Sequence, residues 1–371
     1  MKRILQHPLV IKIFNWEYWP FDVVYAPLYF YWLLMGLRAR AVFFFNTANP
    51  TIKNGGFLME SKKEIYDIIP PEYYPATLLF EPSAPQQHIV NEVYKAKLQF
   101  PLIAKPDIGM RGISVEKVNT MEALLNYAAG SKVPFLVQQF IPFENEAGIF
   151  YYRYPNQKSG HISGIVGKEF LTVTGNGLLT VQQLLQQDAR YILQLKTLQK
   201  TQPALLEEVL AKKETRLLVP YGNHSRGAKF IDITYLTDET LTNTIDGICK
   251  QVPGFFYGRM DIRYNTWEEL RQGKNFSIIE LNGAGSEPTH MYDPRHSIFF
   301  AWKEIIRHWE ILLKISRQNH QLLKMPYMKF KPGMQMLKEN SAYVKLISSQ
   351  FEKKALDGKE SPVKLIDGAL V

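Results

Sequence analysis

Cysteine is almost absent from this 371-residue chain, in which Cys249 is the only one. A single cysteine excludes an intrachain disulfide and a CxxC metal site, and it agrees with a reducing compartment. The sequence also has no internal repeat and no low-complexity tract. Apolar residues make up 46% and charged residues 21% of the chain, which indicates a packed globule rather than a disordered or collagen-like protein. The length suits two domains or one large α/β domain with appendages.

Runs of lysine and arginine that resemble a nucleic-acid-binding tail are lacking, although the formal net charge is +9 and the pI is about 9.2. Much of the positive excess lies toward the C-terminus, for example in Lys314–Arg317 and Lys324–Lys338, and we interpret it as surface charge. The same balance suits an anionic small molecule such as a nucleotide. We therefore expect small-molecule substrates and no nucleic-acid partner.

A signal peptide is lacking as well, because no small-residue cleavage site follows a short apolar core. Trp19–Leu37 approaches the length of a membrane span, but Asp22 and two prolines interrupt it, and a carboxylate at membrane depth is costly. We favour a buried helix, with an interfacial anchor and a true span as alternatives. Trp and Tyr residues with arginines at the end of the segment keep the interfacial alternative open. The expected location is cytoplasmic, with peripheral membrane contact at the inner face through residues 16–40 as that alternative.

Hydrophobic periodicity divides the chain into three parts. These are an aromatic-rich N-terminal region (1–85), a main domain (86–300) and a helical, basic C-terminal extension (301–371) whose last part looks irregular. Strands are predicted at 41–45, 101–105, 114–118, 135–141, 148–155, 161–170, 230–236, 258–264 and 276–282. Helices are predicted at 61–69, 88–98, 121–129 and 180–213, between 236 and 249, and from 297 onward.

Lys105 stands at the end of an apolar strand and is followed by the loop PDIGMRGISV. A lysine in this place directs its ammonium group to a strand terminus, where ligands collect. Gly109 and Gly112 would let the backbone approach a polyanion and point N–H groups at it. A purely structural turn is the alternative, and the Walker A pattern GxxxxGK[ST] is absent.

Gln138 and Gln139 lie in the predicted strand FLVQQFI, and Glu146 follows shortly after it. Amide and backbone groups on a strand edge can recognise the edge of an adenine, and a carboxylate further on can accept hydrogen bonds from ribose hydroxyls. A surface strand without a ligand is the alternative.

Asp261 in GRMDIRY, with Glu280 and Asn282 in FSIIELN, forms the strongest pattern. If the two strands pair as a hairpin, all three side chains meet on one face, because residues two apart on a strand point the same way. Two carboxylates and an amide oxygen are hard ligands that suit Mg²⁺. Both acids follow apolar residues, where an unpaired carboxylate would be costly, and this favours a metal site over a solvated strand face.

The segment NHSRG, from Asn223 to Gly227, offers an amide, a hydroxyl and Arg226 in a glycine-bounded loop. Such a loop suits a transferring phosphate or a substrate carboxylate. His224 could act as a base, although a loop histidine more often caps or stacks. Arg259 precedes Asp261 by two residues, shares its strand face and could neutralise a γ-phosphate.

In this order the motifs resemble the ATP-grasp superfamily of carboxylate–amine ligases, of the D-alanine–D-alanine-ligase-like and glutathione-synthetase-like kind. The resemblance covers about residues 76–296, and TGNGLLTVQQLL (174–185) and GNHSRGA belong to it. It implies an α/β (α+β) fold in which two α+β subdomains clamp ATP. GAGSEPTH after Asn282 departs from the tail of D-alanine–D-alanine ligases, which argues against D-alanine as the substrate.

The resemblance also implies a role for each candidate residue. ATP phosphates would contact Lys105, Lys168 and the loop residues Gly109, Gly112, Ile113 and Ser114. The base and the ribose would contact Gln138, Gln139, Ile141 and Glu146, with Glu144 as a rival of Glu146. Two Mg²⁺ ions, or Mn²⁺, would be held by Asp261, Glu280 and Asn282. The catalytic residues would be Arg259, Arg226 and Asn223.

The function implied is an ATP- and Mg²⁺-dependent ligase that activates a carboxylate as an acyl phosphate for attack by an amine. Metals and arginines would carry this chemistry, because phosphoryl transfer needs charge neutralisation more than a protein nucleophile. Two alternatives are a phosphotransferase that uses the same ATP site and a non-catalytic, nucleotide-binding, membrane-associated protein.

Overall fold

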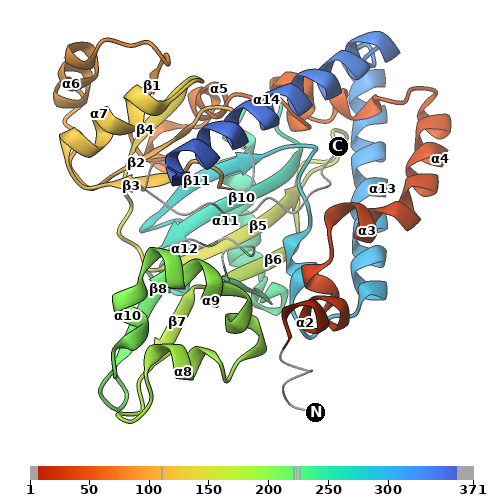
Figure 1. The fold of residues 1–371 in the computed structure, drawn as a ribbon. Coiled ribbons are helices and arrows are strands. Elements are labelled where there is room, and N and C mark those ends of the chain that lie inside the picture. The colour runs from red at the N-terminus through yellow and green to blue at the C-terminus, as the bar shows by residue number, and fades with distance from the viewer. Residues whose placement is uncertain (1–6, 110–111, 220–221, 223, 225–226, 357–371) are drawn as a thin grey trace.

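The computed structural model describes residues 7–109, 112–219, 222, 224 and 227–356. Their strands form three antiparallel sheets in a mixed α/β fold (Figure 1). The strand orders are β1-β4-β2-β3, β11-β10-β5-β6-β9 and β7-β8.

The four-stranded sheet is covered on one face by two helices. Leu102, Ala104, Phe135 and Val137 are buried there with residues of the helices, and the alternation of β2 turns Lys105 to the opposite face. The predicted strands and helices of this part are confirmed. They are α6 (Gln86–Lys95), β2 (Leu102–Pro106), β3 (Glu116–Val118), α7 (Met121–Gly130) and β4 (Phe135–Gln139). The edge strand β1 (Thr77–Phe80) was not predicted.

The five-stranded sheet has one apolar and one charged face. Ile149, Ile165 and Met260 point to the apolar face and pack into a core with α5 and α11. The residues between them, such as Asp261, point to the other face. Both predicted hairpins are confirmed. The elements are α5 (Lys62–Ile68), β5 (Asn145–Tyr152), β6 (His161–Glu169), β9 (Lys229–Asp232), α11 (Glu239–Gln251), β10 (Tyr257–Tyr264), α12 (Trp267–Arg271) and β11 (Phe276–Asn282).

A small lobe with its own core lies between β6 and β9 in the sequence. The helical stretch predicted at 180–213 is three short helices, and the strands that flank it were not predicted. Thr180 begins the first helix with a capping box that satisfies backbone donors at its N-terminus. The elements are β7 (Leu171–Thr174), α8 (Val181–Leu185), α9 (Ala189–Thr201), α10 (Pro203–Glu207) and β8 (Thr215–Val219).

The N-terminal region begins with a series of short helices. They are α2 (Pro8–Phe14), η1 (Trp16–Tyr18), α3 (Phe21–Tyr25), η2 (Ala26–Leu28), α4 (Tyr29–Ala39), η3 (Phe44–Thr47) and η4 (Lys53–Gly56). The strand predicted at 41–45 is wrong, because Phe44 begins a 3-10 helix and only Phe43 makes a β-bridge, to Met328. All three phenylalanines there are buried, and a short apolar run cannot distinguish a strand from a buried helical turn.

The C-terminal extension is more regular than predicted. It consists of α13 (Ile298–Leu322) and α14 (Phe330–Leu356), so the irregular stretch expected after the first helix is wrong as far as Leu356. α13 lies against η3 and α4 (Figure 1). Among the helices in the described part of the chain, none combines the length and the apolar character that a bilayer span requires.

Candidate active site

The charged face of the five-stranded sheet brings the predicted metal ligands together. In the β10–β11 pair, Asp261 lies directly opposite Glu280, and Arg259 lies directly opposite Asn282. Directly opposed residues of antiparallel strands point to the same face. The pairing shifts register after Asp261, which leaves Ile279 as the extra residue of a bulge.

Lys105 reaches this face from the other sheet. Its Nζ donates to Gln138 Oε1 and to the Tyr66 hydroxyl, both at 3.0 Å, and approaches the Ile279 carbonyl at 3.3 Å. Burial lowers the pKa of Lys105 to about 8, while the nearby carboxylates of Glu280 and Asp107 act in the opposite direction. The ammonium group is therefore held close to Glu280 without a direct carboxylate partner.

A network of ion pairs lies beside Asp261. Lys168 Nζ is 2.7 Å from Glu146 Oε1 and 3.3 Å from Asp261 Oδ2, and Arg259 Nε is 2.9 Å from Asp261 Oδ1. Arg263 Nη2 is 3.1 Å from the second oxygen of Glu146. Burial opposes ionisation of Asp261, but the charges of Arg259 and Lys168 lower its pKa.

Two glycines fit tightly around this network. A Cβ on Gly148 would lie 3.0 Å from Asp261 Oδ1, so this glycine gives the carboxylate room on β5. A Cβ on Gly222 would lie 2.5 Å from Glu146 Oε1 and 2.7 Å from Lys168 Cδ. The chain at Gly222 therefore passes directly over this ion pair.

The predicted loop around NHSRG is only partly described. Asn223 and Arg226 lie outside the described residues. His224 Nε2 is 3.0 Å from Glu17 Oε2, and its ring lies 5.5 Å from that of Tyr18. This is the capping and stacking role that was the alternative to a catalytic base.

The loop after Lys105 contacts Lys62, which in turn lies close to the predicted metal ligand Glu280. The Gly109 carbonyl accepts a hydrogen bond from Lys62 Nζ at 3.1 Å. Gly112 and Ser114 both adopt a positive φ, of 72° and 57°, and Ile113 is partly exposed between them. The positive φ of Gly112 is a conformation that glycine adopts readily.

The predicted base-binding residues divide between two faces of β4. Gln138 is buried, with Oε1 on Lys105 and Nε2 donating to Thr77 Oγ1 at 2.7 Å, so the surface-strand alternative is wrong for this residue. The Gln139 side chain turns the other way and hydrogen-bonds the backbone of Gln99. Ile141 follows the end of the strand and is partly exposed.

Sequence reasoning missed Lys62, Tyr66 and Glu287. Lys62 Nζ lies 3.5 Å from Glu280 Oε1, and Tyr66 lies between Lys105 and the Ile279 carbonyl, to which its hydroxyl donates. The only local signal was the helical pattern SKKEIYDI, which does not show what the helix faces.

Glu287 joins the N-terminal region to the site. Its carbonyl accepts from Arg259 Nη1 at 3.2 Å. Its Oε1 accepts from the hydroxyls of Tyr25, at 2.9 Å, and Tyr292, at 3.0 Å. The segment that departs from D-alanine–D-alanine ligases thus contacts a predicted catalytic arginine, and a tyrosine of α3 helps to hold it.

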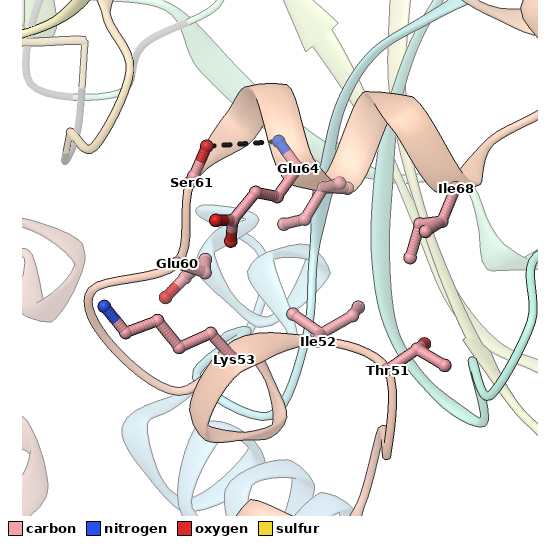
Figure 2. A pocket seen from close by; sticks show the side chains of 8 residues that line it. Thr51, Ile52, Lys53, Glu60, Ser61, Glu64 and Ile68 are labelled. Atoms are coloured by element: carbon pink, nitrogen blue, oxygen red, sulfur yellow. Dashed lines mark hydrogen bonds between the residues drawn. The ribbon is translucent and has the colours of Figure 1, made fainter.

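A small cavity lies near α5 and is far too small for a nucleotide. Figure 2 shows it between η4 and the start of α5. Its volume is about 10 Å³, which is room for about one water. Glu60 contributes to its wall, and one buried oxygen of that side chain has no hydrogen-bond partner among the described atoms. Burial raises the pKa of Glu60. The cavity is lined by Thr51, Ile52, Lys53, Glu60, Ser61, Glu64, Ile65 and Ile68.

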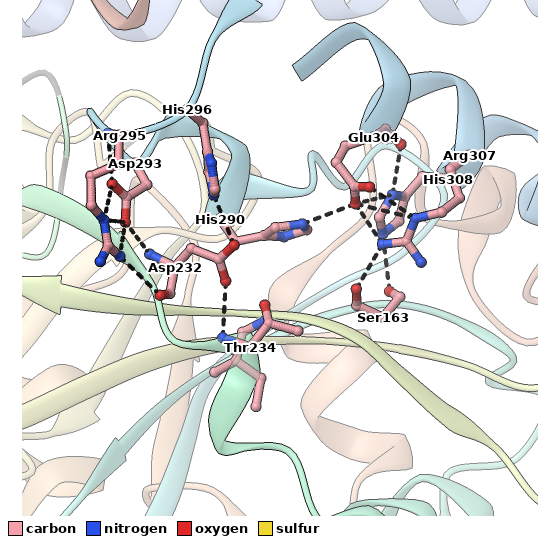
Figure 3. Close-up of polar contacts among 11 residues, drawn as sticks. Ser163, Asp232, Thr234, His290, Asp293, Arg295, His296, Glu304, Arg307 and His308 are labelled. Atoms are coloured by element: carbon pink, nitrogen blue, oxygen red, sulfur yellow. Dashed lines mark hydrogen bonds and ion pairs between the residues drawn. The ribbon is translucent and has the colours of Figure 1, made fainter. Parts of the chain in front are cut away.

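The other end of the same sheet face is closed by α13 (Figure 3). The ring of His290 lies against Gly164 of β6, where a Cβ would come within 2.3 Å of it. His290 Nε2 is 3.0 Å from Glu304 Oε2, and His308 Nε2 is 3.0 Å from Ser163 Oγ. These contacts fasten α13 to the sheet.

The donor set suits Mg²⁺ by its chemistry. Glu280 is one-third exposed, and its carboxylate lies 3.5 Å from Lys62 Nζ, which is a long ion pair. The buried Nδ2 of Asn282 has no hydrogen-bond partner in the described part of the chain, and as a donor it suits a phosphate oxygen, whereas only the amide oxygen of this side chain could bind a metal. No group of three or more His, Cys, Asp or Glu among the described residues could hold a metal, and the predicted set has two carboxylates and an amide. Asp261 would have to exchange an ion-pair partner for the metal.

Comparison with solved structures finds ATP-grasp ligases at low sequence identity. The VanG D-Ala:D-Ser ligase from Enterococcus faecalis is 12% identical, with a TM-score of 0.39, over 70% of this chain and 61% of the ligase. The D-alanine–D-alanine ligase from Coxiella burnetii gives 9% and 0.40, over 71% and 59%. The bifunctional glutathione synthetase from Pasteurella multocida gives 16% and 0.37, over 69% and 39%.

This chain therefore spans less than two thirds of each of those three proteins. No family model matches the chain. No curated protein matches it either. At such identities and TM-scores, the case for a function depends on the residues of the site.

Proposed function

We propose that this chain is an ATP-grasp enzyme that binds Mg-ATP between its four-stranded and five-stranded sheets and joins a carboxylate to an amine. One observation carries the proposal. Lys105 extends from one sheet to the edge of the other, where Asp261, Glu280 and Asn282 share a face. A lysine and oxygen ligands for a divalent cation on facing surfaces are what a triphosphate needs.

The nucleotide would lie with its phosphates at Lys105, the loop Gly109–Ser114 and Lys168. Gln138, Gln139 and Ile141 would border the base. For the ribose, the contacts favour Glu144, because both oxygens of Glu146 are engaged by cations while Glu144 is exposed.

Asp261, Glu280 and Asn282 would hold the metal. Bound Mg²⁺, or Mn²⁺, would supply positive charge that stabilises the phosphate oxygens. Lys168 and Arg259 both contact Asp261, so they lie next to the proposed metal ligands. Their charges would serve the phosphoryl group.

The reaction has two steps. A substrate carboxylate oxygen attacks the γ-phosphorus, the bond to the β,γ-bridging oxygen breaks, and ADP leaves. The amine nitrogen then attacks the acyl carbon, phosphate leaves, and the amine gives up a proton. Arg259, with Arg226 and Asn223 as predicted partners, would neutralise the charge that develops in both steps.

The test combines binding with product analysis. Calorimetry with a non-hydrolysable ATP analogue should detect binding that depends on Mg²⁺ and is much weaker in Glu280→Gln. A screen of carboxylate and amine pairs should then release ADP and phosphate with an amide product. A phosphorylated product without an amide would instead identify a phosphotransferase, and absence of nucleotide binding would refute the proposal.

Substrate identity depends on the segment around Glu287, which differs from the D-alanine ligases and is held by Tyr25 and Tyr292. This carboxylate would favour an amine-bearing substrate next to Arg259. Peripheral membrane contact is a separate proposal, because none of the roles proposed above for individual residues depends on it.

A further inference from the structure

The N-terminal helices leave a large apolar surface uncovered. Of the 22 large hydrophobic side chains that are exposed among the described residues, ten lie between residues 9 and 42. This segment is about a tenth of the chain, whereas single exposed apolar residues are normally scattered. This clustering of exposed apolar side chains indicates that the surface has a function.

The helix α4 is apolar on two opposite sides. Met35 and Ala39 are buried in a core shared with η3 and α13. Phe30, Leu33 and Leu37 are 70%, 60% and 74% exposed, and their spacing places them in one stripe. A helix that only covers a protein core has a polar outer face, whereas the outer stripe of α4 is apolar.

The helix α2 repeats this arrangement on a smaller scale. Ile11 is buried, while Leu9, Ile13 and Phe14 are 64%, 64% and 79% exposed. In Figure 1, α2, α3 and α4 all lie on the side of the molecule that carries α13, away from the four-stranded sheet.

A basic groove adjoins the exposed stripe. It lies where α4 meets α13, has a volume of about 290 Å³, and carries the cations Arg38, Lys314 and Arg317 against one carboxylate, Glu310. Arg38 Nη2 holds the second oxygen of Glu310 at 2.9 Å, and Lys314 and Arg317 are exposed. Arg38 directly follows Leu37 in the helix, so positive charge borders apolar surface.

We propose that this surface docks onto an anionic phospholipid bilayer. Phe30, Leu33 and Leu37 would enter the boundary between headgroups and acyl chains, and the groove at Lys314 and Arg317 would take a lipid phosphate. Apolar side chains beside cations are the two components of interfacial binding. A second copy of the chain fits less well, because it would bring two groups of like charge together.

Vesicle sedimentation of the full chain tests the proposal without ATP, so its outcome is independent of the proposed ligase reaction. The protein should sediment with phosphatidylcholine vesicles that contain about 30% phosphatidylglycerol. Binding should be weaker on pure phosphatidylcholine, and added salt should reduce it. Phe30→Ser/Leu33→Ser/Leu37→Ser should weaken partitioning at least about tenfold.

A second variant tests the groove, and the groove variant and the triple α4 variant each have a matched control. Lys314→Gln/Arg317→Gln should remove most of the preference for anionic vesicles, whereas Lys196→Gln/Lys200→Gln on α9 should not. Tyr94→Ser/Leu178→Ser/Tyr235→Ser removes equally exposed apolar groups elsewhere and should bind like the parent. Circular dichroism checks that each variant is folded.

Either of two kinds of result would overturn the proposal, one from vesicle binding and one from the oligomeric state. One is a parent protein that stays in the supernatant with anionic vesicles, or a triple α4 variant that binds as well as the parent. The other is a dimer in solution that the triple α4 variant converts to a monomer, because a second copy would then cover the surface.

Discussion

Two buried polar clusters lie on the same face of the five-stranded sheet, and they differ in how completely their groups are paired. At one end, in the described part of the chain, Lys168, Arg259 and Arg263 form ion pairs with two carboxylates, Glu146 and Asp261. Lys105 nearby has no direct carboxylate partner, and the Asn282 amide has no partner among the described atoms. The positive excess suits a polyanion.

At the other end the groups satisfy one another (Figure 3). Glu304 contacts His290 and Arg307, and although burial acts against it, these contacts lower the pKa of Glu304 to about 2. Burial, with the charge of Arg307, lowers the pKa of His308 to about 3, so its ring is neutral and lies between Ser163 and the Glu304 carbonyl. Burial of polar groups therefore does not distinguish the two ends, whereas the charge balance of the paired groups does.

The largest expected effect is at the incompletely paired end. Glu280→Gln keeps the shape of the side chain but removes a charge of the proposed metal site, so Mg²⁺-dependent nucleotide affinity should fall at least as much as the roughly 10–100-fold typical of groups that only orient a metal ligand. Calorimetry with and without Mg²⁺ measures this. Glu268→Gln, on the exposed helix of the same hairpin, is the control and should change little.

His308→Gln should affect stability and spare nucleotide binding. It disturbs buried hydrogen bonds to Ser163 and the Glu304 carbonyl, and a loss of about 2–3 kcal/mol in the free energy of unfolding is expected. Urea unfolding measures it. If nucleotide affinity fell as much as in Glu280→Gln, the division between the two ends would be wrong.

The lowered pKa of His308 also predicts that the stability of the fold depends on pH. Its pKa is lower in the folded chain than in the unfolded chain, so the unfolded state binds more protons as the pH falls below about 6.5. Stability should therefore decrease on acidification by up to about 1.4 kcal/mol per pH unit from this residue, and the decrease should be shallower in His308→Gln. Urea midpoints between pH 5 and 7 compare the two proteins.

Lys105→Met should weaken nucleotide binding and leave stability nearly unchanged, which is the opposite of the result expected for His308→Gln. Nucleotide affinity should fall about tenfold with the loss of a phosphate contact, while stability should stay within about 1 kcal/mol. The variant no longer has to bury an ammonium group, which should stabilise the fold. This gain should offset the loss of the hydrogen bond that Lys105 donates to Gln138. A large loss of stability would mean that Lys105 is mainly structural.

The smallest expected effect is proton uptake. Lys105 has a pKa of about 8 without a ligand, so above that pH it is largely neutral, and a bound phosphate would raise its pKa again. Nucleotide binding near pH 8.5 should then take up a fraction of a proton, and affinity should weaken as the pH rises. Calorimetry in buffers of different ionisation enthalpy measures the uptake, which Lys105→Met should abolish.

Local sequence patterns were enough to predict the hairpin that carries Asp261, Glu280 and Asn282. Antiparallel strands close in sequence pair with few alternatives, and the two-residue period then decides which side chains share a face. The strand end at Lys105 followed from the same reasoning. The helix–strand confusion at 41–45 arose where a short apolar run was the only signal, and packing against α13 decided the outcome.

The sequence by itself determined which residue types could bind a phosphate and a metal, and which strand faces they occupy, because strand periodicity and hairpin pairing are local. Only the tertiary structure decided that Lys62 lies 3.5 Å from Glu280, that Tyr25 holds Glu287, and that Lys168 and Arg259 share Asp261. Most of these contacts join segments far apart in the chain. They form only when whole sheets and helices pack, and the pattern of one segment does not specify its distant neighbour.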